Sequence, residues 1–159
     1  MVRFANAELP YATAKVAADG SQKLPVRLLP TVRARLAESR LAFIEQPVHP
    51  DDLEGLRDVR ALGVPLVADE SVYSPADIGR IGRMGAADLV SVYVGKSSAL
   101  ERAIECARLA RELGMDVVIG ANGEMGIGAA AQLHVACACE HLGEIPHGII
   151  GHHFYEEDV

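Results

Sequence analysis

The sequence predicts an α/β fold with parallel strands, a partial TIM-type (β/α)8 barrel of about six βα units. Short, continuously apolar runs, typical of strands buried on both faces, alternate with amphipathic helical patterns. Equivalent strand ends recur about every 25 residues, which indicates a repeated βα unit. A complete barrel takes about 250 residues, so a chain of 159 residues predicts an incomplete one. A doubly wound sheet of six strands is the competing architecture.

The predicted strands share an apolar, β-rich composition, and several of them end in an acid. They are residues 15–19, 41–45, 65–69, 88–94, 116–120 and 145–150. The runs at 41–45 and 65–69 are apolar throughout rather than alternating, which is typical of buried parallel strands. Since the carboxyl ends of such strands meet at one edge, the side chains at that edge are the candidates for chemistry.

The predicted helices share apolar residues at helical spacing. They are residues 24–38, 51–63, 75–84, 98–113 and 128–142. Asp51 and Asp52 suit a helix N-terminus, and Gly63 suits a helix end. Pro75 stands where proline is tolerated, in the first turn. The segment 98–113 is the most clearly amphipathic, and 128–142 is rich in alanine, which suits close packing.

Composition narrows the class of protein. A formal charge of −7 and a pI near 5.3 argue against nucleic acid or an anionic membrane as partner. No apolar run approaches the length of a membrane span, so no membrane partner is expected. The odd number of cysteines, Cys106, Cys137 and Cys139, indicates reduced thiols and a cytoplasmic location. We expect one domain over residues 1–159.

Three predicted strands in succession end in an acid: Asp19, Glu45 and Asp69. One acid at a strand end is more often a helix cap or a solvated loop residue. Three acids in register at one rim would repel one another and raise their pKa values. A hard divalent cation removes that penalty, and oxygen ligands favour Mg²⁺, with Mn²⁺ as an alternative. The sequence therefore predicts a metal site formed by these three carboxylates.

Three motifs resemble the enolase superfamily, and most closely its mandelate racemase/muconate lactonizing enzyme family, muconate-lactonizing branch. They are FIEQP at 43–47, VADES at 67–71 and GANGEMGIGAAAQLH at 120–134. AADGS at 17–21 is a looser match to a motif of the family's third strand. The resemblance implies that Asp19, Glu45 and Asp69 bind Mg²⁺. It implies a substrate-binding or hydrogen-bonding role for Glu70, for which a helix-capping acid is the alternative.

The resemblance also implies a reaction, the abstraction of the proton α to the carboxylate of a small substrate. The outcome would be racemisation, epimerisation, β-elimination or cycloisomerisation. Family bases in this branch are lysines, a Lys-x-Lys motif on strand two and a lysine on strand six. We expect strand two and the family's N-terminal capping domain to be absent from this chain. The alternatives are a catalytically inactive relative that keeps metal binding or a structural role, and a homo-oligomer in which a partner supplies the missing strands.

The resemblance places Tyr93 at the position of the family's strand-six lysine. Tyr93 is expected to act as an acid or base of high pKa, to donate a hydrogen bond, or only to fill the barrel mouth. Lys96 lies three residues further on, where a continuing strand would point it away from Tyr93. Asn122 and Glu124 follow the next strand, and the resemblance matches them to the family's acidic position there. Glu124 is therefore expected to be catalytic and Asn122 to bind the substrate, with loop hydrogen bonding as the alternative, favoured slightly for Asn122. His152 and His153 fit a solvated tail better than a catalytic role.

Overall fold

The computed structural model describes Ala34, Glu38 and residues 41–149 and 155–158. The predicted strand at 15–19, with Asp19, lies outside these residues, as do His152 and His153. Ala34 and Glu38, the described positions of the predicted helix at 24–38, are both helical.

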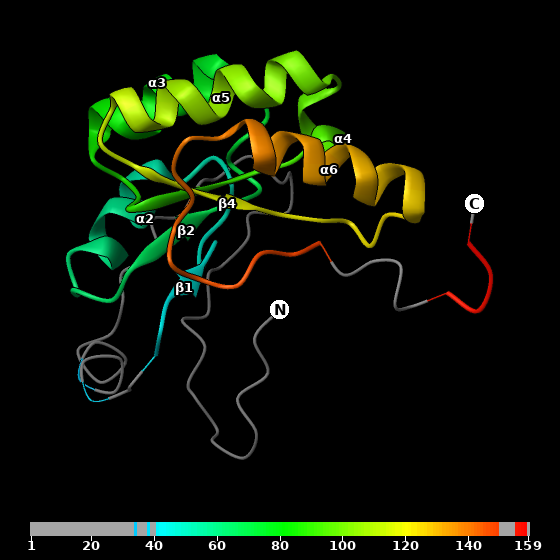
Figure 1. The fold of residues 1–159 in the computed structure, drawn as a ribbon. Helices are drawn as coiled ribbons and strands as arrows, with labels where there is room; N and C mark the ends of the chain where they lie inside the picture. The colour runs from blue at the N-terminus through cyan, green and yellow to red at the C-terminus, as the bar shows by residue number, and fades with distance from the viewer. Residues whose placement is uncertain (1–33, 35–37, 39–40, 150–154, 159) are drawn as a thin grey trace, which may run out of the picture.

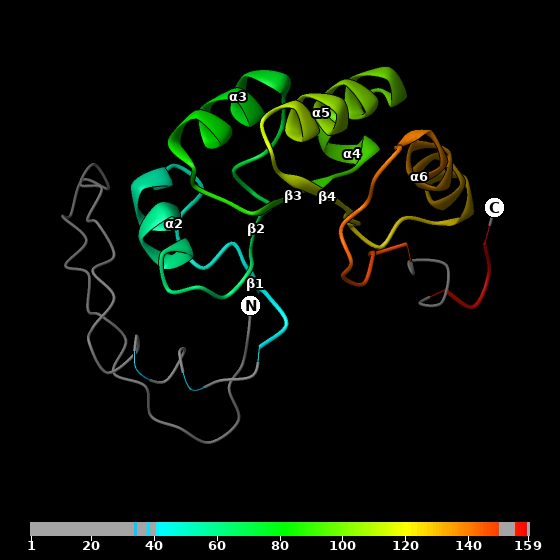
Figure 2. The ribbon, with the colours of Figure 1, turned by 60° about the vertical axis from the view of Figure 1, so that its left-hand side comes forward.

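The sheet contains four parallel strands in the order β1-β2-β3-β4 (Figure 1, with all four strands labelled in Figure 2). They are β1 (Ile44–Glu45), β2 (Leu66–Ala68), β3 (Leu89–Val92) and β4 (Asp116–Ile119). Strand order therefore follows sequence order, as in a barrel, whereas a doubly wound sheet reverses direction at a switch point. The prediction of a partial parallel barrel is confirmed.

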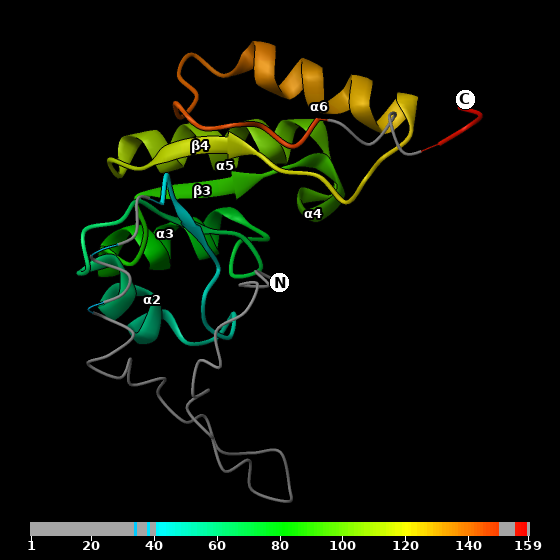
Figure 3. The same ribbon diagram turned by 90° about the horizontal axis from the view of Figure 1, so that it is seen from below.

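Helices cover one face of the sheet in an arc (Figure 2). They are α2 (Leu53–Arg60), α3 (Pro75–Met84), α5 (Leu100–Glu112) and α6 (Gly126–Ala138), with a short α4 (Val94–Ser97) after β3. Seen from below, α2 lies at one end of the row and α6 at the other, beside β4 (Figure 3). Strands and long helices alternate along the chain: α2 comes after β1, α3 after β2, α5 after β3 and α6 after β4. This alternation is the βα repeat that the sequence predicts.

The two faces of each strand contribute to different apolar layers. Leu66 and Ala68 of β2 pack into the core shared with the helices, while Val67 between them belongs to a second cluster on the inner face. Leu89 of β3 and Val118 of β4 lie in that same inner cluster. Side chains alternate along a strand. Residues an even number of positions after Val67, Leu89 or Val118 on the same strand therefore share the inner face.

Helix α3 begins with a set of side-chain hydrogen bonds around Asp77. The Ser74 hydroxyl donates to Asp77 Oδ2 at 2.7 Å, the Tyr73 N–H donates at 3.2 Å, and Arg80 pairs with Oδ1 at 2.8 Å. Partial burial alone would raise the pKa of Asp77, but these hydrogen bonds and the charge of Arg80 outweigh it and lower the pKa below its ordinary 3.8. The ionised carboxylate therefore stabilises the start of the helix.

This lowered pKa predicts an acid-sensitive contribution to stability. Because the folded state binds the Asp77 proton less readily than the unfolded state, the contribution is present above the ordinary pKa of 3.8 and is lost as the pH falls through the lower folded value. Urea unfolding from pH 6 downward should show a smaller loss of stability in Asp77→Asn than in the wild type. The exposed Asp58 (paired with Arg57 at 4.0 Å) supplies the control Asp58→Asn. An equal pH dependence in Asp77→Asn and the wild type would contradict the prediction.

Two sequence-based expectations need correction. Strand β3 ends at Val92 and the chain turns at once into α4, so it does not continue to residue 94. The predicted last strand is not formed over residues 145–149. That segment nevertheless runs beside β4, since the N–H groups of Gly143 and Gly148 donate to Val117 and Ile119 at 2.7 Å each. Two isolated bonds do not make a ladder, although the chain occupies the place of the next strand.

Candidate functional site

Glu45, Asp69 and Tyr93 lie at the carboxyl edge of the sheet. The alternation of side chains along each strand places all three on the inner face. Glu45 is in register with Val67, and Asp69 comes two residues after Val67 on the next strand. Tyr93 comes four residues after Leu89 in the same alternation. The structure thus brings these residues to one edge and one face, while Asp19 lies outside the described residues.

Lys96 reaches this edge from α4. Its ammonium donates to Asp69 Oδ1 at 2.5 Å, to the Asp69 carbonyl at 2.8 Å and to the Ser91 carbonyl at 3.0 Å. It also lies 4.5 Å from the centroid of the Tyr93 ring, within the range of a cation–π contact. The expectation that Lys96 points away from Tyr93 is therefore wrong, because the helical turn of α4 brings the side chain back over the strand end.

Gln46 links the ends of β1 and β2. Its Oε1 accepts the N–H of Asp69 at 2.9 Å and that of Ser71 at 3.2 Å. Its Nε2 donates to Ser71 Oγ at 2.9 Å and to the Val48 carbonyl at 3.2 Å. The backbone of Gln46 has a φ of 34°, in a region that costs a residue other than glycine about 1 kcal/mol or more. The side-chain hydrogen bonds offset that strain.

Burial and neighbouring charges together shift the pKa values of Glu45 and Lys96 at this edge. Partial burial raises the pKa of Glu45, and the charges of Asp69 and Glu70 raise it further, while Lys96 acts in the opposite direction. Burial lowers the pKa of Lys96, and the charge and hydrogen bond of Asp69 oppose that change. An additional cation beside Glu45 would relieve the repulsion among the acids.

Tyr93 is buried and forms a network with the residues that follow β4. Its hydroxyl donates to Asn122 Oδ1 at 3.2 Å, and Glu124 Oε2 accepts the N–H of Asn122 at 2.9 Å. Burial strongly raises the pKa of Tyr93, and the nearby charge of Asp69 adds to the effect. The phenol therefore keeps its proton across the physiological range and suits a hydrogen-bond donor better than a base.

Gly120 makes room for the Tyr93 ring. A Cβ on Gly120 would lie 2.2 Å from Ser91 Oγ and 2.6 Å from the ring. At Gly95 in α4 a Cβ would lie 3.6 Å from the ring, which is ordinary van der Waals contact. The ring is therefore packed against the backbone directly after β4, where a side chain at position 120 would displace it.

The donor set at this edge fits a hard divalent cation. Glu45 and Asp69 supply carboxylate oxygens from adjacent strands, and the raised pKa of Glu45 reflects first its partial burial and then the nearby charges of Asp69 and Glu70. Within the described residues no group of three acidic, histidine or cysteine side chains lies placed to hold a metal ion. The third ligand that the sequence predicts, Asp19, lies outside them, so the complete ligand set stays a prediction.

Sequence reasoning missed one residue of this edge, Gln46, and set another aside, Lys96. Gln46 stands inside the FIEQP motif, between Glu45 and Pro47, but the motif alone gives it no role. Lys96 is the last of three lysines in a chain that otherwise uses arginine for positive charge. Its place directly after a strand was a usable signal, and only the unforeseen turn of α4 hid its direction.

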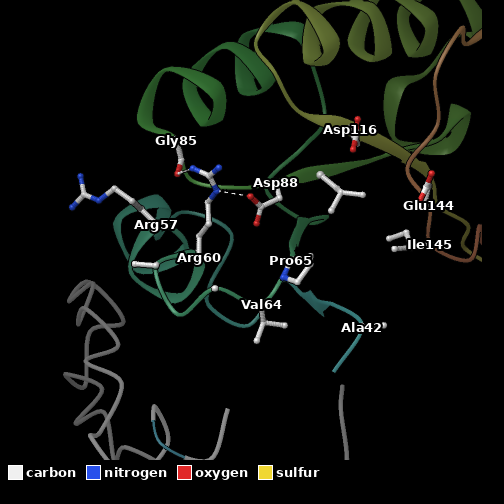
Figure 4. A pocket seen from close by; sticks show the side chains of 13 residues that line it. Ala42, Arg57, Arg60, Val64, Pro65, Gly85, Asp88, Asp116, Glu144 and Ile145 are labelled. Carbon is white, nitrogen blue, oxygen red and sulfur yellow. Dashed lines mark hydrogen bonds and ion pairs between the residues drawn. The ribbon is translucent and has the colours of Figure 1, made fainter. Parts of the chain in front are cut away.

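A hollow lies at the opposite end of the strands (Figure 4). It has a volume of about 680 Å³ and is lined by residues that precede the strands, among them Ala42, Pro65 and Asp88. Arg60 points across it to Asp88, with Nε 2.8 Å from Oδ1. The amino ends of barrel strands serve stability rather than chemistry, so we place the candidate site at the acidic edge instead.

No helix in the described part of the chain has both the length and the apolar character needed to cross a membrane.

Comparison with protein families gives one match over nearly the whole chain. A family model described as "Enolase C-terminal domain-like" matches residues 2–159. The L-Ala-D/L-Glu epimerase of Clostridium acetobutylicum is 35% identical over 100 residues, which cover 62% of this chain. Muconate cycloisomerase 1 of Rhodococcus opacus is 37% identical over 105 residues, which cover 65%. The match spans 28% of the length of each relative.

Solved structures agree with this result. A dipeptide epimerase from Enterococcus faecalis, in complex with Mg and the dipeptide L-Leu-L-Tyr, superposes with a TM-score of 0.70 at 25% identity. The superposition covers 76% of this chain and 34% of the epimerase chain. The parallel βα array described above is therefore shared with an enzyme whose structure contains the metal.

Proposed function

We propose, from the premise that this chain belongs to the enolase C-terminal domain-like family, that it carries the metal-binding edge of a proton-abstracting enzyme. The substrate is a small carboxylate, and the reaction begins with loss of the proton α to that carboxylate. The observation that carries the proposal is the placement of Glu45 and Asp69 at the carboxyl ends of adjacent parallel strands, on one face, close enough for the charge of Asp69 to add to the raised pKa of Glu45.

Glu45, Asp69 and Asp19 are the proposed ligands of Mg²⁺, with Mn²⁺ as an alternative. When bound, such an ion supplies positive charge that stabilises the negative charge developing on the substrate carboxylate. Glu70 contributes to the raised pKa of Glu45 and is proposed to contact the substrate. These assignments follow the chemistry of hard oxygen ligands and the shared array of strands.

Tyr93, Asn122 and Glu124 are proposed to form the opposite wall of the site. The Tyr93 phenol keeps its proton, and by exchanging Asn122 Oδ1 for a substrate oxygen its O–H can donate a hydrogen bond to an oxygen that becomes negative. Asn122 fixes the phenol oxygen, and Glu124 fixes the backbone of Asn122. Asn122 is therefore proposed to bind the substrate together with Tyr93, and Glu124 to take part in proton transfer.

The relatives define the range of outcomes. Two of them are named as an L-Ala-D/L-Glu epimerase and a muconate cycloisomerase. Epimerisation and cycloisomerisation both fit a first step at a carbon next to a carboxylate. Since this chain covers about a quarter of each relative's length, we propose the class of first step and a carboxylate substrate, without choosing between these outcomes.

A catalytically inactive relative that keeps metal binding is the second candidate. Tyr93 stands at the position where the resemblance places a lysine base, and its raised pKa disfavours a base at that point. The ammonium of Lys96 is already engaged by Asp69 and Ser91. These two observations favour binding without turnover.

Deuterium exchange at the α carbon separates the two candidates. The full chain is incubated in D₂O with Mg²⁺ and a set of dipeptides and small carboxylates, and α-deuteration is followed by mass spectrometry. An active enzyme shows metal-dependent exchange, which Tyr93→Phe lowers by about tenfold or more because a donor is lost. Tyr155→Phe is the matched control, since Tyr155 is exposed and its hydroxyl donates to the Gly123 carbonyl. Mg²⁺ binding without exchange in the wild type supports the inactive relative.

A further inference from the structure

Two side chains, one on each side of Asp69 in the sheet, form hydrogen bonds with it. From the β1 side, Gln46 Oε1 accepts its N–H at 2.9 Å. From the α4 side, the Lys96 ammonium donates to its carbonyl at 2.8 Å and to its Oδ1 at 2.5 Å. The backbone and one carboxylate oxygen of Asp69 are therefore fixed by side chains that are distant in the sequence.

Lys96 has no N–H left for another partner. An ammonium has three N–H groups, and the two acceptors on Asp69 and the Ser91 carbonyl account for three hydrogen bonds. The residue is only 9% exposed. A group with all its donors satisfied inside the protein is suited to hold another residue rather than to bind a ligand.

Gln46 is satisfied in the same way. Its Oε1 accepts two backbone N–H groups and its Nε2 donates to Ser71 Oγ and the Val48 carbonyl. Ser71 in turn donates its hydroxyl to the Pro50 carbonyl at 2.7 Å. The amide thus ties the segment after β2 to the loop after β1.

We propose that Gln46 and Lys96 are positioning residues that act through Asp69. Together they hold its carboxylate with Oδ1 turned to Lys96, while Oδ2 accepts no hydrogen bond from the described residues and is left for a cation. This inference rests on the proposed function, because it gives the held carboxylate the task of binding a divalent ion. Side chains that orient metal ligands in this way typically change metal affinity 10–100-fold when they are removed.

A positioning role for Lys96 and the charge of Lys96 predict opposite changes in the affinity for Mg²⁺ when the residue is replaced. Removing the positive charge of Lys96 makes the edge more negative, which on Coulombic grounds tightens the binding of Mg²⁺. Removing its hydrogen bonds frees the Asp69 carboxylate to rotate, which weakens binding. If Lys96 is a positioning residue, the second effect is the larger.

The test is calorimetric titration of the full chain with MgCl₂. Lys96→Met and Gln46→Met are each expected to weaken binding by about tenfold or more, whereas Lys96→Arg, which keeps a charged donor, recovers part of the loss. Arg80→Met is the matched control, since it removes a positive charge from a surface ion pair with Asp77, and its affinity is expected to match that of the wild type. Unchanged or tighter binding in Lys96→Met, or an arginine variant that is folded but binds no better than the methionine variant, would overturn the proposal.

Amide hydrogen exchange of the metal-free chain provides a second measurement. In Gln46→Met the N–H groups of Asp69 and Ser71 should exchange at least tenfold faster, while that of Gly120, which is bonded to the Val92 carbonyl, keeps its rate. A uniform change at all amides would indicate general destabilisation and contradict a local role. If the wild type binds no Mg²⁺, the proposed function fails, whereas the exchange rates still decide whether Gln46 holds Asp69.

Discussion

Asp69→Ala is expected to abolish measurable Mg²⁺ binding and to lower the free energy of unfolding by roughly 3 kcal/mol. The first effect follows from the loss of a proposed ligand. The second follows from Lys96, whose side chain is 5% exposed and loses its carboxylate partner. Removing one member of a buried ion pair leaves a charge without compensation in a medium that solvates it poorly.

The two effects are measured separately, by urea unfolding and by calorimetric titration. The double variant Asp69→Ala/Lys96→Met removes both charges, so it should regain much of the lost stability without regaining metal binding. If the double variant is no more stable than Asp69→Ala, the buried charge is not the cause of the loss. If either variant binds Mg²⁺ like the wild type, Asp69 is not a ligand.

Leu66→Ala is expected to lower the free energy of unfolding by about 3 kcal/mol. Leu66 is fully buried in β2, at 0% exposure, and packs into the core between the sheet and the helices. Its removal loses the transfer free energy of the side chain and leaves a cavity between elements that cannot collapse onto it. The loss should also loosen the strand that carries Asp69.

Leu133→Ala is the matched control for this variant. Leu133 lies in α6 and is 52% exposed, and alanine is a better helix former, so its replacement is expected to change stability by less than about 0.5 kcal/mol. Chemical denaturation of the three proteins gives the comparison. Equal stabilities of Leu66→Ala and Leu133→Ala would contradict the assignment of the core.

Much of the fold could be predicted from local patterns. Pro75 marks the start of α3 as the sequence predicts, and the predicted end at Met84 matches the observed helix. The apolar runs around Leu66 and Val90 are strands buried on both faces. These features depend on residues close in the sequence, where turn chemistry and hydrophobic periodicity carry the information.

The parts that were wrong depend on contacts between distant residues. The short helix α4 begins directly after Tyr93, within a segment whose valine and tyrosine content indicates a continuing strand. Its side chains Lys96 and Ser97 are buried, and the long-range hydrogen bonds of Lys96 to Asp69 and Ser91 stabilise the turn. Local propensity carries no signal for such bonds, so tertiary contacts override it.

The candidate site shows the same division. Glu45 and Asp69 could be placed at one edge from the spacing of strand ends alone. The roles of Gln46 and Lys96 could not, because each depends on hydrogen bonds to residues more than twenty positions away. Their partners are fixed only when the strands have paired in their register.

Anomalous diffraction from crystals of the full chain grown with Mn²⁺ shows whether a cation binds between Glu45 and Asp69. We expect one strong peak at the carboxyl edge of the sheet, within coordination distance of both Glu45 and Asp69 Oδ2, and its disappearance in Glu45→Gln. A peak elsewhere, or none at this edge in well-ordered crystals, would contradict the proposed metal site.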